Sequence, residues 1–135
     1  FSEVPAATLI ADEGAYSIWN KPCGMLSQGS KWGDHASICR WVELRGMPQR
    51  QSYLVHRLDR ATNGLILVAH QKKATVKLAR LFEERLVDKR YRAVVNGQFP
   101  NTIAEMTNDI DGKPALTRIL HCDFNELLKV FDCDV

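Results

Sequence analysis

The apolar run at residues 64–69 constrains the fold more than any other segment of this chain. Its sequence is GLILVA, so no position carries a charge or a polar side chain. A short run that is apolar at every position is typical of a strand buried on both faces of a sheet. It is also far shorter than the roughly 18–20 apolar residues that a membrane-spanning helix needs. We therefore expect residues 64–69 to form a buried strand, and we expect no membrane partner.

Two segments have the periodicity of amphipathic helices. The apolar side chains of residues 71–86 fall on one stripe, at positions i, i+4, i+7 and i+8: Ala74, Leu78, Leu81 and Phe82. The lysines of this segment lie mostly on the opposite side of the helix. A second, shorter helix is predicted for residues 34–44, with Asp34 as its N-terminal cap and with Gly46 and Pro48 ending it.

The remaining apolar stretches have the pattern of strands. In addition to 64–69, the candidate strands are residues 8–10, 15–19, 53–55, 90–96, 115–122 and 127–135. A turn-forming Asp-Glu-Gly sequence at 12–14 separates the first two, and residues 123–126 join the last two. Several strands joined mainly by short turns, together with two helices, predict an α+β fold with a largely antiparallel or mixed β-sheet and flanking helices. The apolar fraction of 45% is sufficient for a buried core.

The basic residues are unevenly distributed, although the net charge is only +2. Residues 70–92 hold eight Lys and Arg residues against three acidic residues. A basic face suits a polyanionic partner such as a nucleic acid, but an ordinary solvated helix face gives the same pattern. Charge alone leaves both interpretations open.

The cysteines and the first residues of the chain point to a cytoplasmic protein. The four cysteines form no C-x-x-C pair and no paired Cys/His spacing: Cys23, Cys39, Cys122 and Cys133. We expect them to be free thiols and expect no metal site. The opening sequence FSEVP has no basic segment followed by an apolar one, so no secretory signal is expected and the cytoplasm is the default location. The missing initial Met suggests a trimmed chain.

One charged segment, at residues 56–60, interrupts the apolar stretches that enter the core. Its carboxylate, Asp59, is flanked by Arg57 and Arg60. We expect Asp59 at the mouth of a sheet, where the backbone is anchored and the side chain can meet solvent. An arginine within a few ångströms would lower the pKa of this carboxyl and favour a nucleophile over a general acid. The alternative, and the commoner case, is a charged turn in which the Asp caps its own backbone or pairs with an arginine.

The central segment is long enough to be compared with known families. Residues 56–67, HRLDRATNGLIL, resemble the signature of the RluA-type pseudouridine synthases, H-R-L-D-x-x-T-S-G followed by an apolar strand. Three weaker matches occur in the right order: NKPCGM at 20–25 resembles N-K-P-x-G-x, KRYRA at 89–93 is similar to K-x-Y-x-A, and GKPALT at 112–117 is similar to G-K-x-A-x-T. The resemblance covers nearly the whole chain.

The resemblance implies an enzyme that isomerises uridine to pseudouridine in rRNA or tRNA, without a cofactor and without a metal ion. Asp59 matches the catalytic carboxylate, which attacks a flipped-out uridine either at C6 of the ring or at the anomeric carbon. Arg57 matches the side chain that fills the vacated space in the RNA, and Tyr91 matches the aromatic residue that packs against the uracil. We also expect contacts with substrate or RNA from three further residues of the central motif: His56, Arg60 and Thr62.

Two departures from the family pattern leave alternatives open. Asn63 replaces the Ser of T-S-G, a mild change because Asn also tolerates turns. The family's later T-G-R-x-H-Q-I-R motif, whose arginine pairs with the catalytic aspartate, does not occur in residues 1–135. We therefore expect these residues to be the N-terminal portion of the catalytic domain, incomplete at its C-terminus and inactive in isolation. The main alternative is a catalytically silent RNA-binding module of the same fold. A small glycoside hydrolase ranks below it, because a second carboxylate about 5–9 Å away would be needed and none accompanies Asp59 in its segment.

Overall fold

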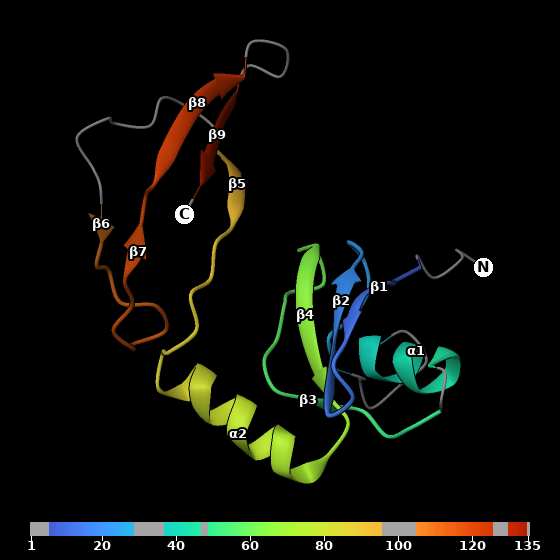
Figure 1. The fold of residues 1–135 in the computed structure, drawn as a ribbon. Coiled ribbons are helices and arrows are strands. Elements are labelled where there is room, and N and C mark those ends of the chain that lie inside the picture. Colours follow the sequence, from blue (N-terminus) through green and yellow to red (C-terminus); the bar gives the residue numbers. More distant parts are fainter. Residues whose placement is uncertain (1–5, 29–36, 47–48, 96–104, 126–129, 135) are drawn as a thin grey trace. The chain divides into compact units, whose positions relative to one another are not determined.

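The candidate site is carried by a four-stranded antiparallel sheet with strand order β1-β2-β4-β3 (Figure 1). The computed structural model describes residues 6–28, 37–46, 49–95, 105–125 and 130–134. The strands of this sheet are β1 (Thr8–Asp12), β2 (Tyr16–Lys21), β3 (Tyr53–Leu54) and β4 (Gly64–Ala69), and the helices are α1 (Ile38–Arg45) and α2 (Lys72–Glu83). These elements belong to one of two compact units, Phe1–Val87, and the remaining strands belong to the other, Asp88–Val135.

The core of the first unit lies between one face of the sheet and α1. Fully buried Ile66 and Val68 of β4 pack there with Trp19 of β2 and with Ile38 and Val42 of α1. Alternate residues of a strand point to opposite faces, so this face takes every second residue of β2 and β4. The core residues of β2 and β4 therefore occupy alternate positions, as expected for a sheet that packs on a helix through one face.

The prediction that β4 is buried on both faces is wrong for Leu65. Its side chain is 61% exposed, whereas Ile66, Val68 and Ala69 are fully buried. Antiparallel sheets are often covered by packed elements on one face only, and here α1 covers the face that carries Ile66 and Val68. The start of the strand requires a glycine, because Gly64 has a φ of 136°.

The turn between β1 and β2 is stabilised by Asp12. Its Oδ1 accepts a hydrogen bond from the backbone N–H of Gly14 at 2.9 Å, and Gly14 has a φ of 80°. Asp12 also forms an ion pair with Arg50 at 2.5 Å. The hydrogen bond from Gly14 and the one from Arg50 hold the pKa of the Asp12 carboxyl below its ordinary value. The predicted turn at residues 12–14 is confirmed.

Both predicted helices are present, with differences at their ends and faces. The predicted cap Asp34 lies outside the described residues. The helix α1 begins after Ser37, whose Oγ accepts from the backbone N–H of Arg40 at 3.3 Å, and Gly46 ends it as predicted. In α2 the predicted stripe is half-buried at Ala74, Leu78 and Phe82, but Leu81 is 40% exposed. The helix packs on β3 and β4, and Leu81 lies outside the buried part of the stripe.

The second unit contains five short strands. They are β5 (Arg92–Val95), β6 (Glu105–Met106), β7 (Thr117–Arg118), β8 (His121–Asn125) and β9 (Val130–Asp134). They form a three-stranded antiparallel sheet of order β5-β9-β8 and a separate β6-β7 pair. The strand predicted at 115–122 is divided into β7 and β8, and residues 123–125, predicted as a turn, continue β8. Pairing with β9 overrides the turn preference of Asp123 and Asn125.

The predicted fold class is confirmed. All pairs of strands described here are antiparallel, and two helices accompany them. Neither of the described helices is long and apolar enough to cross a membrane.

Candidate functional site

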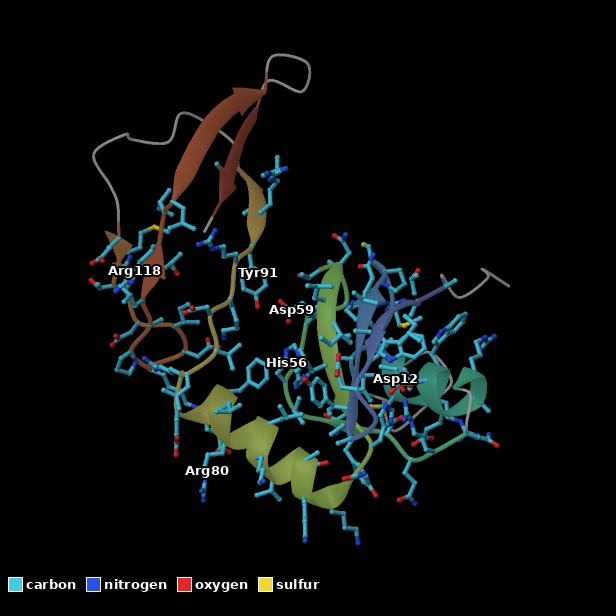
Figure 2. All side chains as sticks on the ribbon, viewed as in Figure 1. Asp12, His56, Asp59, Arg80, Tyr91 and Arg118 are labelled. Atoms are coloured by element: carbon cyan, nitrogen blue, oxygen red, sulfur yellow. The ribbon has the colours of Figure 1, made fainter. Side chains whose placement is uncertain are left out.

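Five of the six predicted site residues lie in the loop between β3 and β4 (Figure 2). Asp59 is exposed, and its neighbour Leu58 is buried at 8% exposure. The backbone N–H of Thr62 donates to the carbonyl of Asp59 at 3.0 Å, so the loop turns directly after the carboxylate. This is the predicted arrangement, in which the backbone is anchored at the rim of a sheet and the side chain is accessible.

The two arginines beside Asp59 do not form ion pairs with it. Within the described part of the chain, no nitrogen of Arg57 or Arg60 comes within 4.0 Å of the Asp59 carboxylate. The side chain of Arg60 instead turns toward the segment after β2, where its Nε donates to the carbonyl of Gly24 at 3.1 Å. The backbone of Arg60 accepts in return from the N–H of Gly24 at 2.7 Å. Both the sequence-based argument for a nucleophile and the charged-turn alternative relied on an arginine close to Asp59, and that expectation is wrong for Arg57 and Arg60.

A buried lysine lies within electrostatic range of Asp59. Lys21, the last residue of β2, has no exposed surface, and its Nζ donates to the carbonyls of Met25 at 2.7 Å and Pro22 at 3.2 Å. Burial lowers the pKa of Lys21 from its ordinary value, and attraction to Cys23 in its thiolate form and to Asp59 partly opposes this shift. The site thus combines an exposed carboxylate with a buried ammonium group.

Sequence reasoning included Lys21 in a motif but gave it no role. The sequence carried no clear signal for this burial, because Ser17 and Lys21 are polar and only the structure shows that they share the buried face of β2 with Trp19. The register of β2 and β4 places Lys21 opposite Gly64, which has no side chain to compete for space.

His56 is held between β4 and α2. Its Nε2 accepts from the backbone N–H of Leu67 at 2.9 Å, so the ring proton is on Nδ1 in the neutral form. Its ring stacks on Phe82 with centroids 4.3 Å apart and planes inclined by 12°. These contacts give His56 a bracing role in the loop that carries Asp59.

Tyr91, the sixth predicted residue, lies in the second unit just before β5. Its side chain is 41% exposed, so the alternative of a tyrosine buried in the sheet is wrong. It lines a depression of about 500 Å³ together with three basic, two apolar, one acidic and one hydroxyl-bearing residue: Lys89, Arg90, Arg118, Leu116, Leu120, Asp88 and Thr117. Two of the motif matches, 89–93 and 112–117, therefore meet at one hollow. The other two, 20–25 and 56–67, meet through Gly24 and Arg60.

The cysteines described by the structure are not part of a metal site. Cys23 is an exposed free thiol and Cys39 is a half-buried one, as predicted for both. Burial raises the pKa of the Cys39 thiol to about 11. The side chains of Cys122 and Cys133 lie outside the described part. Among the residues that are described, no three His, Cys, Asp or Glu side chains are grouped so that they could hold a metal ion.

Comparison with known proteins gives consistent matches. The sequence profile of the RNA pseudouridylate synthase family matches residues 15–126. The "Ribosomal large subunit pseudouridine synthase C" of Rickettsia felis is 33% identical over 92% of this chain and 44% of its own length. The "Dual-specificity RNA pseudouridine synthase RluA" of Escherichia coli is 38% identical over 69% of this chain and 42% of its own length. The chain thus spans less than half the length of either relative.

A solved structure shares the fold. The "Human RNA Pseudouridylate Synthase Domain Containing 1" superposes with a TM-score of 0.69 at 19% identity, over 98% of this chain and 59% of the human chain. The profile match covers most of the chain, and the relatives agree with the motif resemblance at residues 56–67. The chain therefore belongs to the RNA pseudouridylate synthase family, and within it to the RluA type.

Proposed function

We propose that this protein isomerises uridine to pseudouridine in rRNA or tRNA, with Asp59 as the covalent nucleophile. The observation that carries the proposal is the exposed carboxylate of Asp59 on an anchored loop, with the buried charge of Lys21 nearby. The relatives are named for action on the ribosomal large subunit and on RNA. These names support an RNA substrate for this chain.

The reaction is balanced without any oxidant, reductant or second substrate. The glycosidic bond between N1 and C1′ of the target uridine breaks, and its electron pair stays with the base. The base then turns within the pocket, and a bond forms between C5 and C1′. The proton lost from C5 balances the proton gained at N1. A carboxylate that bonds transiently to C6 or to C1′ divides this difficult step into easier ones.

The carboxylate of Asp59 is suited to nucleophilic attack because no hydrogen bond or ion pair among the described residues engages it. In the described part of the chain it accepts no hydrogen bond and forms no ion pair, so no partner must be displaced before it reacts. The positive charge of Lys21 attracts it through the protein, where such an interaction is screened less than in water.

Further RNA contacts are proposed for residues of the family-like motifs and of α2. A stacked uridine cannot reach Asp59, so it must be extruded at a cost of a few kcal/mol. Arg57 is exposed and is proposed to occupy the space that the base leaves. Tyr91 is proposed to stack on the uracil, an interaction worth about 1–3 kcal/mol. Arg60 and Thr62 shape the loop, and the exposed cations of α2 are proposed to contact phosphates: Lys72, Lys73, Lys77 and Arg80.

The test measures pseudouridine formation by the full-length protein on rRNA and tRNA transcripts. We expect Asp59→Asn to abolish product while RNA binding is retained. The matched control is Glu13→Gln, which neutralises an exposed acid in the turn between β1 and β2 and should leave the rate unchanged. Product formation by Asp59→Asn at the wild-type rate would refute the proposal. Tight RNA binding by a wild-type protein that forms no product would indicate the catalytically silent RNA-binding module instead.

A further inference from the structure

The backbone beside Asp59 is held by a serine from a distant part of the chain. Ser27 follows the loop after β2 and is only 3% exposed. Its Oγ accepts from the backbone N–H of Leu58 at 2.9 Å, and it also donates to the carbonyl of Leu58. One hydroxyl therefore satisfies both polar groups of the residue that precedes the carboxylate.

This pair of hydrogen bonds requires a hydroxyl group. A hydroxyl carries one donor and two acceptor sites, so it can bond an N–H and a C=O at once. Leu58 is buried at 8% exposure, and water has little access to its N–H and carbonyl. Within the described residues, no other partner is recorded for these two groups. Alanine at position 27 would leave both groups unsatisfied.

The residue after Asp59 is held from the same segment. The N–H of Gly24 donates to the carbonyl of Arg60 at 2.7 Å, and Arg60 Nε donates back to the carbonyl of Gly24 at 3.1 Å. Lys21 stabilises the segment that contains Gly24, because its Nζ donates hydrogen bonds to the carbonyls of Pro22 and Met25. Asp59 thus lies between two residues that are fixed by one short stretch of chain.

We propose that Ser27 is a positioning residue for Asp59, a role that rests on the proposed function. Ser27 does not touch the substrate. It fixes the peptide groups of Leu58, and so the direction in which the Cα–Cβ bond of Asp59 points. Nucleophilic attack depends steeply on this geometry, since a displacement of about 1 Å can reduce a rate by about 100-fold.

The experiment compares variants of the full-length protein in steady-state kinetics on an RNA substrate. Ser27→Ala is expected to lower kcat by about 100-fold, with KM and RNA affinity unchanged. Ser27→Thr keeps the hydroxyl and is expected to restore most of kcat. The matched control is Ser52→Ala, because Ser52 is also buried and its Oγ has no hydrogen-bond partner in the described part of the chain. This control should retain wild-type kcat.

Folding is monitored by circular dichroism so that rates refer to folded protein. If Ser27→Ala does not fold, Ser27→Cys provides the second variant, since a thiol is a weak donor and a weak acceptor. Its kcat is expected between those of wild type and an inactive variant. A kcat equal to wild type in folded Ser27→Ala or Ser27→Cys would overturn the proposal, as would loss of kcat that Ser27→Thr fails to restore.

Failure of this proposal is distinguishable from failure of the proposed function. A wild-type protein that forms no pseudouridine, or an Asp59→Asn variant that still forms it, refutes the function and the role of Ser27 together. An active wild type with inactive Asp59→Asn and fully active Ser27→Ala refutes the role of Ser27 alone.

Discussion

Replacing the buried lysine beneath the site, Lys21→Met, should destabilise the protein measurably. The substitution removes the hydrogen bonds from Nζ to the carbonyls of Met25, at 2.7 Å, and Pro22, at 3.2 Å. A buried carbonyl left without a partner costs about 1–3 kcal/mol, and the fully buried position of Met25 keeps water away from its backbone. The longer bond to Pro22 contributes less.

An opposing contribution limits the loss. Burial lowers the pKa of Lys21, which shows that the fold disfavours its charge, and methionine removes that cost. We expect a net decrease in the free energy of unfolding of about 1–3 kcal/mol and a decrease in Tm of about 3–10 °C. Urea titration of full-length protein, followed by the fluorescence of buried Trp19, gives the free energy.

The control for this prediction is Lys73→Met, an exposed lysine on α2. Its effect should remain within about 0.5 kcal/mol, as for most surface substitutions. If Lys21→Met is as stable as this control, the burial cost of the ammonium group cancels its hydrogen bonds, and the structural role assigned to Lys21 is refuted.

Three further predictions concern pH, RNA affinity and the substrate base. His70 donates from Nδ1 to the carbonyl of Gln51 and accepts at Nε2 from Ser17, and burial, assisted by Arg50, lowers its pKa. As the pH falls, the unfolded chain therefore binds this proton before the folded protein does. Tm should be constant at pH values above about 6.5, the ordinary pKa of histidine, and should decrease below that pH. Thermal melts of His70→Gln should show a smaller decrease. Replacing Lys77 by Ala should reduce the slope of log affinity for RNA against log salt concentration by about 0.7–0.9 if this residue neutralises one phosphate. An unchanged slope in filter-binding assays would show that Lys77 of α2 faces solvent and does not contact RNA. Tyr91→Ala should lower kcat/KM by about 5- to 150-fold, the equivalent of 1–3 kcal/mol of stacking, and Tyr91→Phe should retain most activity; equal losses in both would exclude stacking as its role.

Several features of the fold could be predicted because they depend on neighbours in the sequence. The strand at residues 15–19, the stripe of α2 and the turn at residues 12–14 are local patterns, and each element appears where its pattern lies. The central motif likewise predicted that Asp59 would stand on an anchored loop with an accessible side chain. Its residues are contiguous, so their chemistry can be read without knowing what packs around them.

Predictions failed where a distant segment decided the outcome. Residues 123–125 have turn-forming side chains, but pairing with β9 extends them as a strand. An arginine was expected within a few ångströms of the Asp59 carboxylate, yet Nε of Arg60 bonds Gly24, 36 positions away in the chain. The RNA contact expected of Arg60 stays a prediction. Ser27 and Leu58 are 31 positions apart, and neither has a local pattern that signals the other.

The sequence by itself determined the types of chemistry available: one carboxylate in a long family-specific motif, a periodic helix and a set of short strands. Only the tertiary structure decided that Asp59 lies near the buried charge of Lys21, that Arg60 bonds Gly24, and that Ser27 holds the preceding residue. The physical reason is the range of the interactions. Hydrophobic periodicity depends on residues that are close in the sequence, so it can be recognised within one element. The partner of a buried polar group depends on which distant segments lie side by side in the folded sheet.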